Sequence, residues 1–314
     1  MKLIKALSIA LLTMNAATVT SALAEYPEKP VQFIVPFPPG DLEDILTRQI
    51  AEGFQEKYGV STAVVNKPGG GGGPFPGAVE ASFAPADGYV VGSFVADVPV
   101  IGPEIGIPPL NPFPFEPLGH FLTYPFIVVA KGDAPFSNFE ELATYAKDNP
   151  VTLGHFGNGA IPTDSVLALA AQKGFSYKSD APFDALDCNT LASGDVDVIT
   201  TTVQQVRPCL DDLNVLFSIG HERISMLPDV PTMGEIEPGL NIGTWNGLFV
   251  KTGTPQDVKD KIIAVAKEVV MSAPAQKIAE ETGAKVYWKD AEATATQITE
   301  DRKTVAKIQE LIAK

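Results

Sequence analysis

The sequence is poor in the residues that build metal, nucleophile and nucleic-acid sites. Its 314 residues include three histidines and two cysteines, and 38 acidic residues outnumber 23 basic ones, for a formal net charge of −15. His120, His155 and His221 are scattered and lack the spacing of metal ligands, so neither a metal nor a cofactor is expected. Nucleic acid and anionic membranes are disfavoured as partners, because binding them depends on clustered Lys and Arg.

Motifs for phosphate binding and nucleophilic catalysis are missing as well. The glycines at 69–73 are not followed by the Lys-Ser or Lys-Thr of a phosphate loop, and no Gly-x-Ser-x-Gly elbow occurs. We interpret 69–73 as a turn before a helix that begins near Gly77. The lack of a catalytic constellation agrees with a protein that binds its ligand without a catalytic group, and an exported enzyme stays open as an alternative.

The first 24 residues are typical of a bacterial export signal. Lys2 and Lys5 precede an apolar stretch at 6–14 that is too short to cross a bilayer, and Ala-Leu-Ala at 22–24 is a cleavage signal. We expect cleavage after Ala24 and a soluble mature chain in the periplasm. That compartment allows the two cysteines to pair.

A disulfide between Cys188 and Cys209 would close a loop of about 20 residues and stabilise the fold by roughly 3 kcal/mol in the chain-entropy model. We expect this disulfide, with two free thiols as the alternative.

Strand-like and helix-like patterns alternate along the mature chain, which predicts an α/β fold with mostly parallel sheets flanked by helices. The expected strands are 33–35, 62–65, 90–93, 127–129, 151–154, 196–201, 215–219 and 248–250. The expected helices are 43–58, 77–84, 138–148, 164–173, 257–272, 273–282 and 291–311.

Two proline-rich passages interrupt this alternation and indicate joints between domains. The segment 99–117 has seven prolines, which suits an extended crossover on the surface better than a central strand or helix. A second joint is expected at 227–239. The predicted organisation is a cleft between two lobes. The first lobe comprises 25–124 and 245–314, and the second comprises 125–244.

Two strand–turn–helix units have the form of small-ligand sites. In the first, an apolar strand at 31–35 leads into the turn 36–40, and a helix follows directly. In the second, the strand at 151–154 leads into a glycine-rich turn and a further helix. Helix N-termini offer unpaired N–H groups, so one anion-binding loop from each lobe is expected to face the cleft.

Asp41, Glu43 and Asp44 fall in the first turn of the first of these helices. Acidic side chains there stabilise a helix by about 0.3–1 kcal/mol each, and Asp41 also suits the capping position. A role at the ligand is the alternative, and with it an exported enzyme that uses cleft carboxylates. An Asp41 carboxylate about 6 Å from a ligand carboxylate would cost on the order of 3 kcal/mol at an effective dielectric of 20.

A series of short motifs occurs in a specific order along the mature chain. They are Tyr-Pro-x-Lys-Pro-Val at 26–31, Ile-Val-Pro-Phe-Pro-Pro-Gly at 34–40, Val-Asn-Lys-Pro-Gly at 65–69, Ala-Asp-Gly-Tyr at 86–89, Gly-Asn-Gly at 157–159, Ser-Gly-Asp-Val-Asp at 193–197, Leu-Pro-Asp-Val-Pro-Thr at 227–232, Trp-x-Gly-Leu-Phe at 245–249 and Gly-Thr-Pro at 253–255. With them the chain resembles the periplasmic substrate-binding proteins of tripartite tricarboxylate transporters, the Bug or TctC family. The resemblance implies a Venus-flytrap fold that delivers a small, usually carboxylated solute to membrane permease subunits.

The resemblance also implies that backbone amides and ordered waters of two loops, 37–44 and 157–163, hold the solute's carboxylate. Other positions are similar to pocket-lining sites of the family. The implied ligand-binding residues are Phe37, Pro38, Pro39, Gly40, Asp41, Asp44, Phe94, Asn158, Gly159, Ala160, Thr163, Thr201, Thr202 and Trp245. For Trp245 the alternative is a core aromatic at the hinge.

The chain departs from the family pattern in both loops. Where relatives continue Gly40 with a second glycine it has Asp41, and Ala160 and Thr163 stand for the usual Ser and His. Glu43 adds another acid nearby. We expect a mono- or dicarboxylate, and these departures favour a monoacid, an amide or a partly cationic solute over a dicarboxylate. The receptor is expected to be a monomer, and a sensory adaptor that presents ligand to a signalling partner is the remaining hypothesis.

Overall fold

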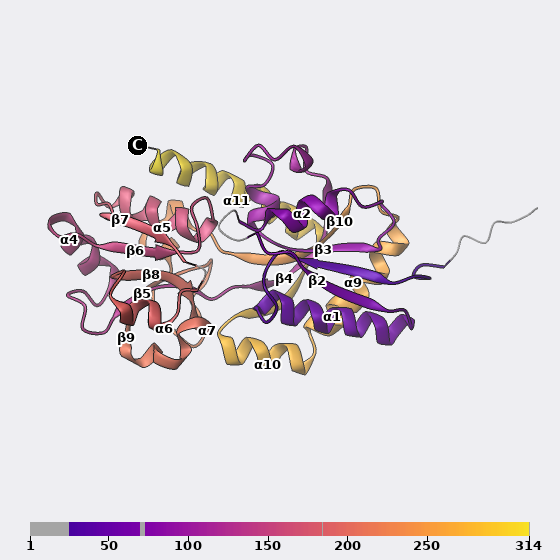
Figure 1. Cartoon of the computed structure of the whole chain (residues 1–314), viewed down its shortest axis with the longest axis horizontal. Coiled ribbons are helices and arrows are strands. Elements are labelled where there is room, and N and C mark those ends of the chain that lie inside the picture. Colours follow the sequence, from indigo (N-terminus) through magenta and orange to yellow (C-terminus); the bar gives the residue numbers. More distant parts are fainter. Residues whose placement is uncertain (1–24, 70–72, 184, 314) are drawn as a thin grey trace, which may run out of the picture.

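Two mixed β-sheets, each flanked by helices, organise the chain into two lobes (Figure 1). The structure is a computed structural model that describes residues 25–69, 73–183 and 185–313. It confirms the predicted two-lobed α/β fold. In the described part of the chain, no helix combines the length and the apolar character needed to span a bilayer.

The first sheet has six strands in the order β11-β4-β10-β3-β1-β2. Its strands are β1 (Val31–Val35), β2 (Thr62–Asn66), β3 (Val90–Val95), β4 (Phe115–Thr123), β10 (Trp245–Lys251) and β11 (Lys285–Asp290). The accompanying helices are α1 (Leu42–Tyr58), α2 (Phe75–Ser82), α3 (Asp97–Val100), the short η2 (Pro108–Leu110), α9 (Gln256–Val270), α10 (Ala273–Thr282) and α11 (Ala291–Ile312).

The second sheet has five strands in the order β7-β6-β8-β5-β9. Its strands are β5 (Phe126–Lys131), β6 (Thr152–His155), β7 (Ser179–Pro182), β8 (Val198–Thr202) and β9 (Leu213–Ile219). The accompanying helices are α4 (Phe139–Asp148), α5 (Ile161–Gln172), α6 (Cys188–Ser193), α7 (Val203–Val206), η3 (Arg207–Asp212), α8 (Met233–Ile236) and η4 (Pro238–Leu240).

The expectation of mostly parallel sheets is wrong, because both sheets are mixed. β1 pairs in parallel with β2 and β3, and β6 pairs in parallel with β7 and β8. The remaining pairs, β10 with β3 and β4, β4 with β11, and β5 with β8 and β9, are antiparallel. The alternation of strands and helices in the sequence does not reveal whether neighbouring strands are parallel. β10, for example, enters the first sheet after the chain has passed through the other lobe, and it pairs antiparallel with both of its neighbours.

The proline-rich segment 99–117 is not a surface crossover throughout, contrary to expectation. Leu110 is fully buried, and Phe115 begins β4, which lies between β10 and β11 inside the first sheet. The register between β4 and β10 shifts next to Pro117. Prolines are tolerated in sheets at such irregularities, which explains how a proline-containing strand occupies an interior position.

Helix α1 follows the first of the two loops that the sequence predicts to bind the ligand. Leu42, Leu46, Ile50 and Phe54 recur at every fourth position and are buried against the core, and each such side chain contributes about 1.5–3 kcal/mol of burial free energy. Gly59 ends the helix with φ at 69°, a conformation that glycine adopts without strain. The apolar stripe therefore fixes the direction in which the first helical turn faces.

Three connections join the lobes. The chain crosses after β4 and again before β10, and these crossings run side by side, since Tyr124 N donates to Thr244 O at 2.9 Å. The third connection is α11, which packs on β4 of the first sheet and on α5 beside the second (Figure 1). The predicted lobe boundaries place all of α11 in the first lobe, although its packing is shared.

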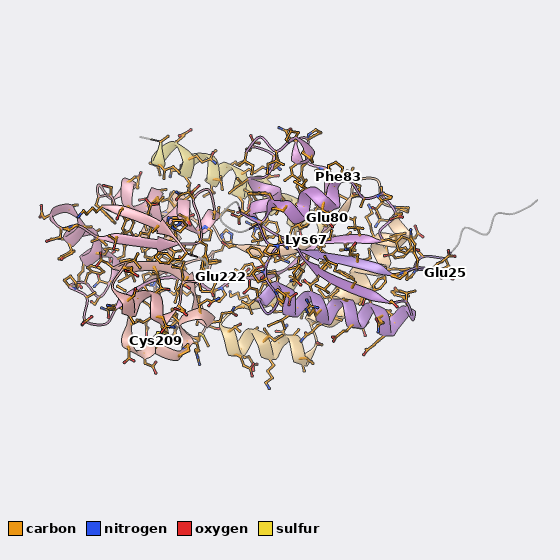
Figure 2. All side chains as sticks on the ribbon, in the orientation of Figure 1. Glu25, Lys67, Glu80, Phe83, Cys209 and Glu222 are labelled. Carbon is orange, nitrogen blue, oxygen red and sulfur yellow. A yellow bond between two sulfur atoms is a disulfide. The ribbon has the colours of Figure 1, made fainter. Side chains whose placement is uncertain are left out.

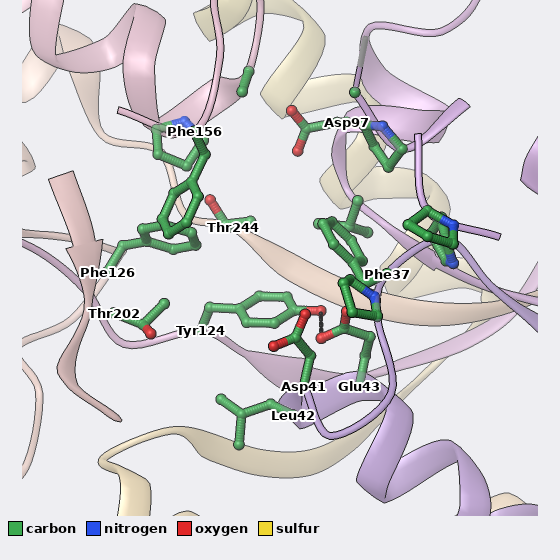
Figure 3. Close-up of a pocket in the computed structure, with 18 of the residues that line it drawn as sticks. Phe37, Asp41, Leu42, Glu43, Asp97, Tyr124, Phe126, Phe156, Thr202 and Thr244 are labelled. Atoms are coloured by element: carbon green, nitrogen blue, oxygen red, sulfur yellow. Dashed lines mark hydrogen bonds between the residues drawn. The ribbon is translucent and has the colours of Figure 1, made fainter. Parts of the chain in front are cut away.

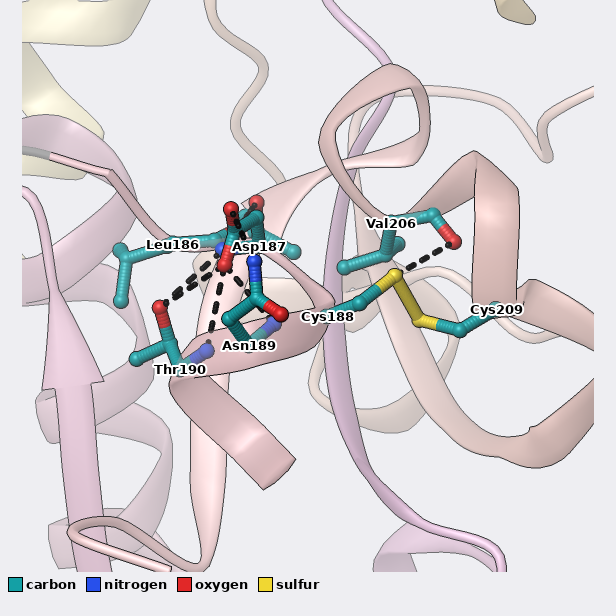
Figure 4. Close-up of a disulfide and its surroundings, with 8 residues drawn as sticks. Leu186, Asp187, Cys188, Asn189, Thr190, Val206 and Cys209 are labelled. Carbon is teal, nitrogen blue, oxygen red and sulfur yellow. Dashed lines mark hydrogen bonds between the residues drawn. A yellow bond between two sulfur atoms is a disulfide. The ribbon is translucent and has the colours of Figure 1, made fainter. Parts of the chain in front are cut away.

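Cys188 and Cys209 form the predicted disulfide, with Cα atoms 6.0 Å apart (Figure 4). It ties the first residue of α6 to η3 in the second lobe. Asp187 caps α6 beside the bridge by accepting from the backbone N–H groups of Asn189 and Thr190. The prediction of a disulfide is confirmed.

Candidate functional site

A cavity of about 530 Å³ is lined by residues from both lobes (Figure 3). The first lobe contributes the turn after β1, the first turn of α1, the end of β3, the start of α3, and residues 68, 69, 73 and 74 between β2 and α2. The second contributes the loop after β6, the first turn of α5, the end of β7 and the β8–α7 junction. Tyr124 and Thr244, at the two crossings, complete the lining.

Three carboxyl side chains line the first-lobe wall of this cavity: Asp41, Glu43 and Asp97. Asp41 occupies the N-cap position of α1, but its side chain makes no capping hydrogen bond and lines the cavity instead. Burial, and next the charge of Asp44, raises the pKa of Asp41. The capping role expected for this side chain is therefore wrong.

Glu43 is the most unusual of the three carboxyl groups. Its side chain is 2% exposed, Oε2 accepts from the Tyr124 hydroxyl at 2.9 Å, and Oε1 has no hydrogen-bond partner. Burial, reinforced by the charge of Asp41, raises its pKa to about 8. Glu43 is thus a buried acid with one oxygen left unpaired beside the cavity.

Asp97 connects the two lobes. Its Oδ1 accepts from the backbone N–H of Ile161, the first residue of α5, at 2.9 Å. Burial raises its pKa to about 6, and the nearby charge of Asp164 adds to that rise. A carboxylate of this chain thus accepts the hydrogen bond from the first N–H of α5. The sequence predicted that a ligand carboxylate would bind at this helix N-terminus.

The glycine amides of both predicted loops are also held internally. Gly40 N donates to Asp44 Oδ2 at 2.8 Å, and Gly159 N donates to Asp164 Oδ1 at 3.0 Å. Burial alone would raise the pKa of Asp44, but hydrogen bonds from Arg48, Asn66 and Gly40 outweigh it and lower the pKa. These carboxylates stiffen the loops rather than face the cavity.

Aromatic side chains form much of the remaining lining: Phe37, Tyr124, Phe126, Phe156 and Phe183. Phe126 packs against Tyr124 and Phe156 with ring centroids 6.1 and 6.2 Å away, nearly perpendicular to Phe156. In Figure 3 Phe126 and Phe156 lie on one side of the cavity and Phe37 on the other. The cavity is therefore bounded by ring faces and edges as well as by carboxyl groups.

Basic side chains are absent from the described residues that line the cavity. Two basic side chains of the first lobe that are close to the lining in sequence are engaged elsewhere. Arg48 pairs with Asp44, and the Lys67 ammonium lies 2.9 Å from a Glu80 carboxylate oxygen (Figure 2). Uncharged polar groups of the lining come from the second lobe and its crossing: Thr202, Gln204, Gln205 and Thr244, whose buried hydroxyl has no partner.

The predicted ligand-binding residues divide into two groups. Those that line the cavity are Phe37, Pro38, Asp41, Ala160 and Thr202. Those outside the lining are Pro39, Gly40, Asp44, Phe94, Asn158, Gly159, Thr163, Thr201 and Trp245. Contact with a solute stays a prediction for all of them.

Several residues of the second group have clear structural partners. Phe94 is buried against Phe249, with ring centroids 5.7 Å apart. Thr201 donates to Leu186 O at 2.6 Å. The Trp245 indole donates to Asp301 on α11 at 2.7 Å, which fits the core aromatic at the hinge that the sequence left as the alternative.

Sequence reasoning missed part of the lining, most clearly Asp97, Tyr124 and Phe126. Asp97 had a usable signal, because it is the second residue after β3, and ligand sites of α/β proteins gather at the carboxyl ends of parallel strands. Tyr124 and Phe126 flank a crossing between lobes and fall in no periodic pattern. Their position follows from the tertiary arrangement alone.

Residues 46–314 match the family described as the Tripartite tricarboxylate transporter family receptor, TctC. The chain belongs to this family. Asp41 and Glu43 precede the matched residues. Members of the TctC family are periplasmic receptors that bind solutes, so the predicted family and receptor class are confirmed.

Individual relatives agree with this assignment. A UPF0065 protein in the tcbD-tcbE intergenic region of Pseudomonas sp. (strain P51) is 27% identical over 277 residues, which cover 83% of this chain and 80% of the relative. The periplasmic binding protein BugD is 26% identical, with a TM-score of 0.74 over 90% of this chain and 97% of that one. The structure of R. palustris Rpa4515 with adipate shares the fold at 21% identity, with a TM-score of 0.77 over 92% and 99% of the two chains.

Proposed function

We propose that this chain is a periplasmic receptor that captures a small organic acid between its two lobes and delivers it to the permease of a tripartite transporter. The observation that carries the proposal is the cavity lined from both lobes in a chain of this receptor family. The adipate in the related Rpa4515 fold supports a carboxylated solute. Such a receptor catalyses no reaction, so the solute is released from the cavity chemically unchanged.

The second-lobe wall supplies the donors that suit a solute carboxylate. Thr202, Gln204 and Gln205 carry hydroxyl and amide donors toward the cavity, and the unpaired Thr244 hydroxyl lies at the crossing. Direct or water-mediated hydrogen bonds to these groups would hold a carboxylate. The two side-by-side crossings at Tyr124 and Thr244 are the natural hinge for closing the lobes.

The cellular part of the proposal follows from the export signal and the family. The leader is removed after Ala24, and the mature chain works in the periplasm as a monomer. Permease subunits in the inner membrane receive the solute from the closed form. Deleting the gene should abolish uptake of the solute that binds the purified protein.

Thermal unfolding of the purified mature chain with a panel of small mono- and dicarboxylates and their amino derivatives tests the proposal. A true solute present at about a hundredfold over its Kd stabilises the folded state by about 2.7 kcal/mol, so the Tm rises measurably. Mass spectrometry should recover that solute unchanged. The proposal fails if no acid or amino acid of the panel raises the Tm, or if the recovered molecule is chemically altered.

A further inference from the structure

We propose that the solute is zwitterionic, with a positively charged nitrogen against Asp41, Glu43 and Asp97 and a carboxylate facing the second lobe. The inference rests on the proposed receptor function and narrows its substrate class from organic acids in general to acids that also carry an ammonium group. Four observations support it.

The first observation is the charge of the lining. Three carboxyl groups face the cavity from the first lobe, and the described lining has no Lys, Arg or His to offset them. A dicarboxylate that spans the cavity would bring its second carboxylate against this wall. Repulsion between that carboxylate and the acidic side chains of the wall would weaken binding. An ammonium group in the same place is attracted by the carboxylates of Asp41 and Asp97 and favours the ionised form of Glu43.

The second observation is the unpaired oxygen of Glu43. Only 2% of this residue is exposed. Its Oε2 accepts a hydrogen bond from the Tyr124 hydroxyl, and its Oε1 has no hydrogen-bond donor in the protein. A buried polar atom without a partner is costly, so native structures usually supply one. The N–H of a bound ammonium group would be the missing donor.

The third observation is the ring of aromatic side chains beside the acids. Phe37 and Tyr124 flank Asp41 and Glu43 in Figure 3, and Phe126 packs on Tyr124. Aromatic faces attract cations within about 6 Å of the ring centre, most strongly where water is excluded. Carboxyl groups and ring faces together are the chemistry that recognises an organic ammonium ion.

The fourth observation is the polarity across the cavity. The second-lobe wall offers neutral donors, Thr202, Gln204 and Gln205, and no carboxyl group in its described lining. The Ile161 N–H at the α5 N-terminus is not available to the solute, because it already donates a hydrogen bond to Asp97. One wall therefore suits a cation and the opposite wall suits a carboxylate, which is the charge pattern of a zwitterion.

Matched probe pairs test the inference on the mature chain. In each pair one carboxylate of a diacid is replaced by an ammonium group: adipate with 5-aminopentanoate, glutarate with 4-aminobutanoate, and succinate with 3-aminopropanoate. Calorimetric titration should give at least one amino acid that binds about tenfold or more tightly than its diacid partner. Diacids that bind as tightly as, or more tightly than, every matched amino acid would overturn the inference while leaving the receptor function intact. If neither class binds, the proposed function itself fails.

The variant Glu43→Gln provides the second measurement. It keeps the shape of the side chain but cannot ionise when an ammonium group binds, so affinity for the preferred amino acid should fall about tenfold or more, whereas affinity for its diacid partner should be unchanged or higher. Glu56→Gln, an exposed carboxylate on the same helix, is the matched control and should leave both affinities unchanged. Equal effects of the two variants would contradict the inference even if an amino acid is the better ligand.

Discussion

The two lobes face the cavity with the same local design but opposite chemistry. In each, a strand leads through a glycine turn into a helix whose first turn carries a carboxylate that holds the turn: Asp44 bonds to Gly40 and Asp164 bonds to Gly159. In each, the N-cap residue and the second residue of the helix line the cavity. The first lobe has Asp41 and Glu43 at these two positions, and the second has Ala160 and Pro162.

The comparison distinguishes the carboxylates that hold the loops from the carboxyl groups that line the cavity. The internal carboxylates that stiffen the loops are present in both lobes, so they belong to the shared framework. The acids that line the cavity are confined to the first lobe, where Asp97 joins Asp41 and Glu43 from α3.

The largest expected effect is the pH dependence that Glu43 imposes on stability. Its folded-state pKa of about 8 exceeds the ordinary value of 4.5, so the folded state holds a proton that the unfolded chain releases. Stability should therefore be highest below about pH 4.5 as far as this group is concerned, and should decrease by about 3–5 kcal/mol as the pH rises through about 8. Asp41, Asp44 and Tyr124 face the same group.

Denaturant unfolding at about pH 5 and about pH 8.5 measures this effect. Glu43→Gln should be more stable than the unmodified chain at the higher pH and should remove most of the slope. Glu56→Gln, on the exposed face of α1, should keep the slope. A slope of the same size in Glu43→Gln would show that this side chain is not the source.

The disulfide of the second lobe gives the next largest effect. Replacing Cys188 and Cys209 by serine should lower the free energy of unfolding by about 3 kcal/mol, because the reduced unfolded chain gains loop entropy. Solute affinity should stay within about twofold, since neither cysteine lines the cavity. A large loss of affinity would mean that the bridge shapes the second-lobe wall.

The bond between Asp97 and Ile161 tests the contact between the lobes. Asp97→Ala leaves the buried Ile161 N–H without a partner, which should cost about 1–3 kcal/mol in the free energy of unfolding. Asp97→Asn keeps an acceptor oxygen and should recover most of that loss. Equal stability of Asp97→Ala and the unmodified chain in denaturant titrations would rule out a stabilising role for this bond.

Making the two walls alike gives the smallest expected effect. Ala160→Asp places a carboxylate on the second-lobe wall, and affinity for the solute should fall about tenfold, equivalent to about 1.4 kcal/mol. Ala171→Asp adds the same charge at an exposed position of α5 and is the control. Titration calorimetry compares them, and equal affinities would show that the solute places no carboxylate near Ala160.

The sequence predicted the framework better than the site. Apolar runs such as β1 and the fourfold spacing of α1 are local signals, and those elements were predicted correctly. β4, β7 and β11 were missed: β4 contains Pro117, and β7 is a short, mostly exposed edge strand with a terminal proline. The mixed strand directions were also missed, since they depend on how the chain crosses between lobes.

At the site, position along a helix was predictable and the surroundings were not. Asp41 was identified as unusual because relatives have a second glycine there, and Glu43 because it adds another acid in the same helical turn. Which of the neighbouring acids faces inward depends on the buried stripe of α1 and on Tyr124, which reaches Glu43 from a segment 81 residues away. Asp97 meets Ile161 across the two lobes, a contact that no local pattern encodes.

Proton exchange on binding reports whether the solute brings an ammonium group to Glu43 and Asp97. Calorimetry of the preferred solute at about pH 7, in buffers with different ionisation enthalpies, counts the protons released or taken up. An ammonium group beside Glu43 and Asp97 lowers the pKa of both, so we expect release of up to about one proton per solute bound, and its loss in Glu43→Gln. Proton uptake would mean that the protonated acids donate to a solute carboxylate, and would contradict the account.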